Sequence, residues 1–114
     1  MIDSYDFGRI RINQKLYVKD VIILPDRILE DWWRKQGHLL RLEDIQSAVE
    51  ESAPDVVVVG RGKFGVMKVS FEVEDYLRDK KILFYAEKSD KAVEMFNQIL
   101  GSGKRVLGAF HLTC

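Results

Sequence analysis

The chain has 114 residues, of which 46% are hydrophobic and 32% charged, and its 18 basic residues balance its 18 acidic ones. This size predicts one domain over residues 1–114, and the neutral balance argues against nucleic-acid binding, which usually needs a cationic excess. One cysteine excludes an intrachain disulfide, and no aliphatic run is long enough to span a bilayer. With no signal-peptide pattern at the start, we expect a soluble, cytoplasmic protein without membrane insertion.

The first quarter of the chain predicts β structure. Polar and apolar residues alternate over residues 9–12 and 15–18, on either side of a two-residue turn at 13–14. We expect the apolar side chains of this hairpin to share the core-facing side: Ile10, Ile12, Leu16 and Val18. A further apolar run over residues 21–24 ends at Pro25, whose nitrogen carries no hydrogen for a strand ladder.

From residue 42 onward, the chain alternates between helical and strand patterns. A helical stripe over residues 42–49 ends before Pro54. The later segments predict a buried strand at 56–59 and further strands at 82–86 and 106–112, separated by two helices (70–79 and 90–100). Such alternation with short connections is typical of right-handed βαβ crossovers onto a largely parallel sheet. The sequence therefore predicts an α/β fold.

The ends of these helices carry recognisable cap residues. Ser70 is expected to cap the first of the two later helices, and Ser89 or Asp90 is expected to open the second. Gly101 and Gly103 supply left-handed positions after the last helix. The two helices are expected to cover one sheet whose buried side chains include Val57, Val59, Ile82, Phe84, Val106 and Phe110.

A glycine-rich loop follows the valine strand and suggests chemistry. Residues 60–65 read G-R-G-K-F-G, which matches the G-x-G-x-x-G pattern of dinucleotide-binding loops. Arg61 and Lys63 add two cations, and Glu87 ends the next strand, where a ribose-binding acid would lie. However, residues 66–69 separate the last glycine from the following helix, so the helix N-terminus is displaced from the glycines.

We therefore favour a structural turn with glycines at positive φ over a ligand-binding loop. The turn hypothesis predicts that Gly62→Ala destabilises the protein and that loss of the Arg61 side chain has almost no effect on stability. The candidates for ligand or anion contact, should the loop bind one, are Gly60, Arg61, Gly62, Lys63, Gly65 and Glu87. No cofactor is expected.

A second group of residues could recognise a protein partner: Trp32, Trp33, Arg34 and His38. Adjacent tryptophans on extended chain face opposite ways, so one of them is expected at the surface. The alternative, which we favour, buries both in part beneath the first helix with their N–H groups bonded. His111 and Cys114 could be imagined as a dyad or as metal ligands, but no orienting group or third ligand is evident, and neither a catalytic nor a metal site is predicted.

Several segments together resemble one family across the whole chain: Y-D-F-G-R-I-R-I-N, D-V-I-I-L-P-D, W-W-R-K-Q-G-H, D-V-V-V-V-G-R-G-K-F-G and the terminal H-L-T-C. The chain resembles a small α/β family of unknown function whose eukaryotic relatives include a mitochondrial complex I assembly factor and an adipogenesis-associated protein. The resemblance implies a three-layer fold with a mixed, mostly parallel central sheet, helices on both sides and an added N-terminal antiparallel β element. It implies no established reaction.

These observations favour a non-catalytic interaction or assembly module with a protein partner. The sequence shows no convincing nucleophile, acid–base pair or metal cluster, so it favours the absence of enzymatic activity without deciding it. The alternative is a small-molecule or anion-binding module, with or without catalysis, that uses the glycine loop at 60–65.

Overall fold

The computed structural model describes residues 1–114. It contains three helices: α1 (Leu42–Ser52), α2 (Phe71–Asp79) and α3 (Ser89–Gly101). Its strands are β1 (Ile2–Asp6), β2 (Arg9–Ile12), β3 (Lys15–Tyr17), β4 (Val21–Ile23), β5 (Ile28–Leu29), β6 (Leu39–Leu40), β7 (Val56–Arg61), β8 (Lys68–Val69), β9 (Leu83–Glu87) and β10 (Val106–His111). None of the three helices combines the length and apolarity needed to cross a membrane.

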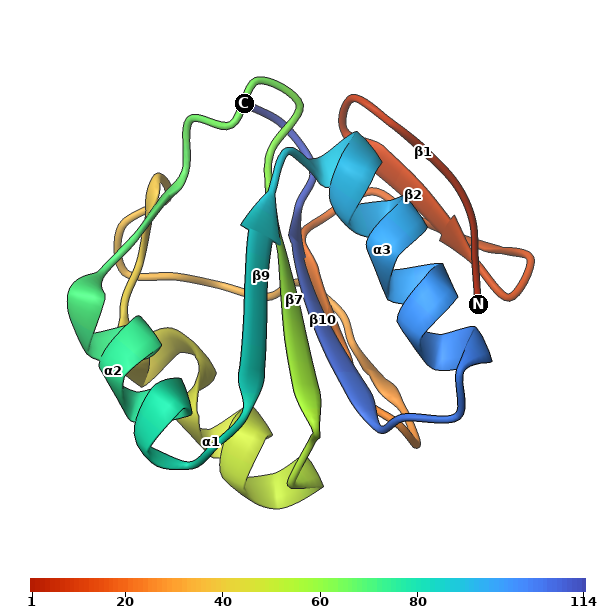
Figure 1. Ribbon diagram of the computed structural model, residues 1–114. Helices are drawn as coiled ribbons and strands as arrows, with labels where there is room; N and C mark the ends of the chain where they lie inside the picture. The colour runs from red at the N-terminus through yellow and green to blue at the C-terminus, as the bar shows by residue number, and fades with distance from the viewer.

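Five strands form the central sheet in the order β5-β4-β10-β7-β9 (Figure 1). β10, β7 and β9 run parallel, as the βαβ pattern predicts, while β4 joins β10 antiparallel and β5 joins β4 antiparallel. α1 and α2 cover one face of the sheet, and α3 covers the other. The predicted α/β class, the mixed sheet and the helices on both sides are confirmed. The expected burial of Ile82 and Phe84 is wrong, because β9 (Leu83–Glu87) is an edge strand and both side chains are only partly buried.

β7 explains why the valine run is continuous rather than alternating. β10 and β9 bond to its two edges, so the strand is enclosed within the sheet. Val57 and Val59 pack in the cluster beneath α1 and α2, whereas Val56 and Val58 pack in the cluster beneath α3. A parallel strand covered on both faces needs apolar side chains at every position.

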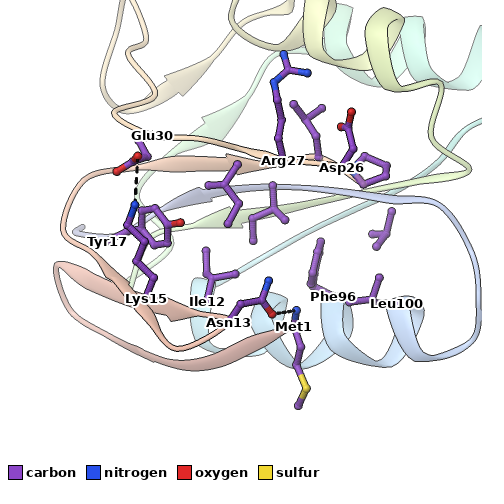
Figure 2. Close-up of a pocket in the computed structure, with 15 residues that line it drawn as sticks. Met1, Ile12, Asn13, Lys15, Tyr17, Asp26, Arg27, Glu30, Phe96 and Leu100 are labelled. Carbon is purple, nitrogen blue, oxygen red and sulfur yellow. Dashed lines mark hydrogen bonds and ion pairs between the residues drawn. The ribbon is translucent and has the colours of Figure 1, made fainter.

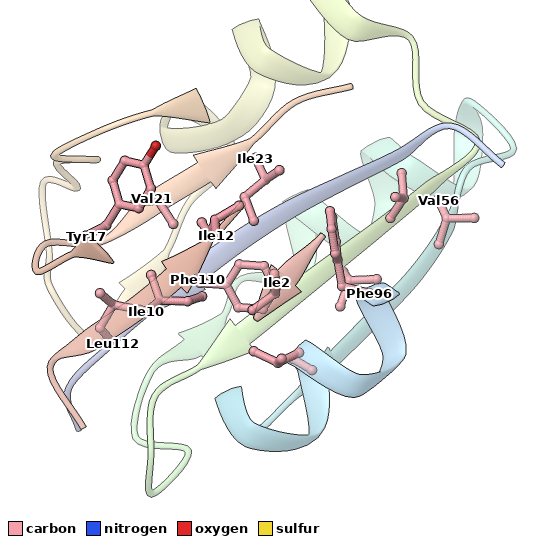
Figure 3. Close-up of a cluster of buried hydrophobic side chains, with 14 residues drawn as sticks. Ile2, Ile10, Ile12, Tyr17, Val21, Ile23, Val56, Phe96, Phe110 and Leu112 are labelled. Atoms are coloured by element: carbon pink, nitrogen blue, oxygen red, sulfur yellow. The ribbon is translucent and has the colours of Figure 1, made fainter. Parts of the chain in front are cut away.

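The N-terminal strands β1, β2 and β3 form a separate antiparallel sheet. Figure 3 shows Ile2, Ile10 and Ile12 of this sheet in the same cluster as Phe96 of α3 and Phe110 of β10. The N-terminal antiparallel element is therefore confirmed. β1 itself gave no periodic signal, because Ile2 is its only fully buried residue.

The predicted core face of the hairpin is wrong at two positions. The turn at residues 13–14 forms as expected and pairs Ile10 with Tyr17. Directly opposed residues share a face, so Tyr17 is buried beside Ile10. Leu16 and Val18 fall on the opposite face and are 45% and 65% exposed. Tyr17, whose ring is apolar and whose hydroxyl is polar, is therefore buried where the pattern predicted Leu16 and Val18.

The helix caps agree with the sequence only in part. Ser70 occupies the N-cap of α2 as expected, without a side-chain cap bond. α3 begins at Ser89, one of the two residues expected to open it, and Lys88 occupies its N-cap. Gly101 lies in the last turn of α3, and the positive φ after the helix belongs to Gly103. The Ser89 hydroxyl is unavailable as a cap because it bonds to segments outside the helix.

Three two-residue strands, β5, β6 and β8, were not predicted. Segments this short carry no usable periodicity, so their pairing depends on tertiary contacts. β6 and β8 pair parallel in a small sheet of their own, and β5 forms the outer edge of the central sheet beside β4.

The corrected hairpin face can be tested with two neighbouring substitutions. Tyr17→Ala should lower the free energy of unfolding by about 3 kcal/mol, because it empties a buried site. Leu16→Ala, on the exposed face, should cost less than about 1 kcal/mol. Urea titrations followed by circular dichroism measure both values, and equal losses would contradict the assigned face.

Candidate functional site

The glycine loop connects β7 to β8 at the carboxyl ends of the parallel strands (Figure 1). Gly62 and Gly65 have φ of 97° and 71°, which confirms the expectation of a turn at positive φ. Gly60 lies within β7 and is required for a different reason: a Cβ there would come within 2.7 Å of the Phe110 ring and the Ser89 hydroxyl. Close packing and turn geometry therefore account for all three glycines.

Most backbone N–H groups of this loop are bonded within the protein. The N–H of Gly62 donates to Ser89 Oγ at 2.9 Å, and the N–H of Lys63 donates to the Thr113 carbonyl at 2.7 Å. The N–H of Val66 donates to the backbone oxygen of Cys114 at 3.0 Å. A phosphate-binding loop instead directs its free N–H groups at the ligand. The loop is thus tied to the residues that follow β10.

The cations of the loop also have partners. Arg61 donates from Nε to the Met67 carbonyl at 2.8 Å and from Nη2 to the Gly65 carbonyl at 2.9 Å, so its guanidinium closes the loop. This geometry revises the expectation that Arg61 has almost no effect on stability. Lys63 Nζ lies 5.8 Å from the centre of the Tyr5 ring. Glu87 lies in β9 opposite Gly60 of β7.

Ser89 and Tyr5 connect the loop to the end of β10. The Ser89 hydroxyl accepts from Gly62 and donates to the His111 carbonyl at 2.7 Å. The Tyr5 hydroxyl donates to the Leu112 carbonyl at 2.8 Å, and burial raises the pKa of Tyr5 to about 12. Both hydroxyls therefore act as fixed structural donors beside the loop.

A buried ionic cluster lies at the same end of β10: Asp20, Arg34 and His111. The Asp20 carboxylate contacts Arg34 Nη2 at 2.9 Å and His111 Nδ1 at 2.8 Å, and it accepts the N–H of Leu112 at 2.8 Å. The three side chains come from distant parts of the chain. No spacing pattern relates them, so the sequence analysis placed Arg34 in a surface patch and did not consider Asp20 at all.

The hydrogen bonds of the cluster define the state of the imidazole. The two hydrogens on Arg34 Nη2 are directed at Asp20 and at the Gly37 carbonyl, 2.8 Å away. Because a carboxylate only accepts, His111 Nδ1 carries a hydrogen and donates it to Asp20. His111 Nε2 lies 3.5 Å from Thr113 Oγ1, long for a bond between a base and a nucleophile. Nε and Nη1 of Arg34 are buried without partners.

The electrostatics of the cluster favour an ionised Asp20. Burial by itself would raise the pKa of this carboxyl. Hydrogen bonds from His111 and the Leu112 N–H, together with the charges of His111 and Arg34, outweigh burial and bring the pKa below its ordinary value. The carboxylate therefore neutralises a guanidinium that is held almost out of solvent.

The structure separates the members of the predicted tryptophan patch. Trp32 is half-buried and donates its indole N–H to the Asp44 carbonyl at 3.0 Å. The centre of its ring lies 4.6 Å from the guanidinium carbon of Arg34. Trp33 is 76% exposed, so the favoured expectation that both tryptophans are partly buried is wrong for Trp33; His38 is also exposed. Arg34 is buried in the ionic cluster and is not available at the surface. Of the four candidates, Trp33 and His38 could meet a partner.

An aromatic pair lies at the tip of the glycine loop, and no sequence pattern marks it. Phe64 of the loop and Phe7 of the β1–β2 turn are 65% and 51% exposed, and their ring centres lie 6.2 Å apart. Gly8 donates its N–H to the Leu112 carbonyl, which holds the β1–β2 turn beside the loop. Two phenylalanines in contact at the surface form an apolar feature that isolated exposed side chains do not.

A cleft of about 440 Å³ lies between β3, the β4–β5 turn and the end of α3, away from the glycine loop (Figure 2). Its charged residues are largely paired: Lys15 with Glu30 at 3.7 Å, and Arg27 with Glu51. Asp26 is the only charged side chain of the lining without an ion pair, and the N-terminal ammonium of Met1 donates to Asn13 Oδ1. The cleft thus lacks the convergent free polar groups that a small-molecule site usually provides.

The fold is shared with several solved structures. A conserved hypothetical protein from Pyrococcus horikoshii OT3 superposes with a TM-score of 0.83 at 25% identity, over 100% of this chain and 99% of that one. A protein described as an outer membrane protein from Bartonella henselae superposes with a TM-score of 0.83 at 24% identity, over 99% of this chain and 94% of that one. A Bordetella pertussis protein described as a Mth938-like domain superposes with a TM-score of 0.63 at 17% identity, over 98% of this chain and 85% of that one. In addition, residues 2–111 match a family described as "Protein of unknown function (DUF498/DUF598)".

The role of Gly62 can be separated from simple backbone strain. A Cβ at Gly62 would overlap the backbone of Cys114, whereas a Cβ at Gly103, also at positive φ, would meet nothing within 4 Å. Gly103→Ala should therefore cost about 1 kcal/mol, and Gly62→Ala at least about 2–3 kcal/mol, because strain and overlap add. Thermal and urea unfolding measure both variants, and equal losses would show that the contact with Cys114 is dispensable.

The ionic cluster predicts a pH-dependent contribution to stability. Asp20→Asn keeps the size of the side chain but leaves Arg34 without a counter-charge, so it should cost about 3 kcal/mol at neutral pH. Because the folded-state pKa of Asp20 is lowered, its contribution is complete above about pH 4 and is lost as the pH falls through the folded-state pKa. Urea titrations at several pH values should show the variant's deficit shrinking in acid.

The matched control for this prediction is Asp31→Asn. Asp31 pairs with Lys19 at 3.8 Å on the surface, with both side chains largely exposed. Its loss should cost less than about 1 kcal/mol at any pH. A deficit of Asp20→Asn that stayed constant down to strongly acidic pH would rule out the ionised carboxylate as its cause.

Proposed function

The chain belongs to the DUF498/DUF598 family of proteins of unknown function, and within it we propose that this protein is a non-catalytic interaction or assembly module. The proposed binding surface is the aromatic pair Phe7–Phe64 at the tip of the glycine loop. The observation that carries the proposal is the contact between these two rings, 51% and 65% exposed, on a loop most of whose backbone N–H groups are bonded within the protein.

The rigidity of the loop supports this role. Arg61 closes the loop through two carbonyls, and the N–H groups of Gly62, Lys63 and Val66 bond to neighbouring segments. A side chain presented on a pre-organised loop loses little conformational entropy when a partner binds. Aromatic residues at the centre of a contact are also favoured in protein interfaces. The resemblance to a family with an assembly factor among its eukaryotic relatives points to the same class of function.

The alternative is an anion-binding loop, and one observation favours it. Lys63 takes part in no ion pair of the structure, and the side chain of Lys88 runs beside Gly65. Two lysines near one loop could attract phosphate. However, the inward bonding of the loop N–H groups leaves the lysines to act as solvated point charges, and we expect only a weak attraction that salt screens.

The proposal is tested by binding with matched surface variants. Immobilised wild-type protein captures partners from a native cell extract, and each purified candidate is then titrated against wild type, Phe64→Ser and Phe71→Ser. Phe71 is 82% exposed and serves as the control, since its ring has no aromatic neighbour in the structure. We expect Phe64→Ser to weaken binding at least about tenfold and Phe71→Ser to leave it unchanged.

Two results would count against the proposal. The first is a partner that binds wild type, Phe64→Ser and Phe71→Ser equally. The second is a large rise in melting temperature with phosphate or a nucleotide that Lys63→Ala and Lys88→Ala remove together. A ligand at a hundredfold its dissociation constant adds about 2.7 kcal/mol, so a genuine anion site would be plain in such a scan.

A further inference from the structure

β9 forms an open edge of the central sheet. It bonds to β7 on one side, and no strand lies on its other side (Figure 1). Its pairing with β7 is continuous from Leu83 to Glu87, without a bulge, and the strand contains neither proline nor lysine. Natural proteins usually protect a free edge with such features, because its unpaired backbone groups can add another strand. β9 lacks this protection.

The backbone groups available at this edge follow from the pairing with β7. Leu83 donates its N–H to the Asp55 carbonyl, so Leu83 and Tyr85 direct their backbone groups toward β7. Phe84 and Ala86, the alternate residues, direct theirs away from it. Neither residue takes part in any hydrogen bond outside the ladder. The edge thus presents two unpaired N–H groups and two unpaired carbonyls in line.

The side chains beside the edge form an apolar strip. Leu83 and Tyr85 are 54% and 38% exposed and share the face of β9 toward α3. They border a shallow groove of about 330 Å³ whose other wall is supplied mainly by α3 and the residues after it, including Ile99 and Lys104. A strand added at the edge would cover this strip while it bonds to Phe84 and Ala86.

We propose that the occupant of this edge is β9 of a second copy of the chain, paired antiparallel about a two-fold axis at Phe84. In this register the backbone N–H and carbonyl of Phe84 bond to those of Phe84 in the second copy, because both groups point away from β7. Leu83 lies opposite Tyr85 of the partner subunit, so the exposed side chains cover each other. The two central sheets become one continuous sheet, and the contact closes on itself as an isologous dimer.

Charge complementarity favours a second copy as the occupant. Lys81 lies in the turn before β9, with φ of 61°, and Glu87 ends the strand, so antiparallel pairing at Phe84 places the turn that carries each Lys81 near Glu87 of the other copy. Lys88, the next residue, would approach like charge, but its side chain is packed along Gly65 and away from the edge. The segment thus carries a cation in the turn before the strand and a carboxylate at the end of the strand, and a two-fold axis brings these opposite charges together twice.

The test is the molecular mass of the wild-type chain, measured by light scattering and sedimentation from micromolar to millimolar concentration. We expect a monomer–dimer equilibrium. Tyr85→Lys should yield monomer with an unchanged circular dichroism spectrum, because the added charges repel across the axis at an exposed site. Phe71→Lys, exposed at the start of α2, is the control and should leave the dissociation constant unchanged.

A charge swap tests the register itself. Glu87→Lys places like charges opposite at both ends of the paired strands and should weaken the dimer about tenfold, or 1.4 kcal/mol. The double variant Lys81→Glu, Glu87→Lys restores opposite charges and should recover most of that loss. A wild-type chain that stays monomeric, a dimer that Tyr85→Lys leaves intact, assembly beyond a dimer, or a double variant no better than Glu87→Lys would each overturn the proposal.

Discussion

The carboxylate of Asp20 holds together parts of the chain that no local structure connects. It pairs with Arg34 from the irregular segment after β5, bonds to the ring of His111 in β10 and accepts the N–H of Leu112. Arg34 in turn fastens its own segment through the Gly37 carbonyl. A buried guanidinium is tolerated only with a counter-charge, so the position of the segment around Arg34 depends on one carboxylate.

The end of β10 that this cluster fixes is also the support of the glycine loop. Residues 111–114 accept hydrogen bonds from Ser89, Tyr5, Lys63 and Val66. The loop, the β1–β2 turn and the start of α3 therefore share one anchoring segment. In a dinucleotide-binding fold, the N–H groups of the loop at this place donate to phosphate. Here they donate to oxygen atoms of the protein itself. The result is a rigid end of the molecule that presents Phe7 and Phe64.

The two surfaces assigned to partners differ in their physics. The aromatic pair is small and lies on a loop held by internal hydrogen bonds. Its contribution to the free energy of binding would come from apolar burial and from the low entropy cost of fixed side chains. The β9 edge offers backbone groups in a fixed direction, so its contribution would come from ladder hydrogen bonds and from register. β9 and the loop lie on different parts of the sheet, and one contact does not exclude the other.

The sequence by itself determined the α/β class, the three parallel strands, the helices between them and the positive φ of Gly62 and Gly65, because each follows from local periodicity or from the backbone freedom of one residue. The tertiary structure decided that β9 is a partly exposed edge strand rather than a buried one. The tertiary structure decided which hairpin residues are buried, since the pairing register placed Tyr17 and not Leu16 in the core. It also decided the site. The partners of Arg61, and the contact of Asp20 with His111, depend on how distant parts of the chain pack together. Such long-range contacts leave no periodic pattern in the sequence.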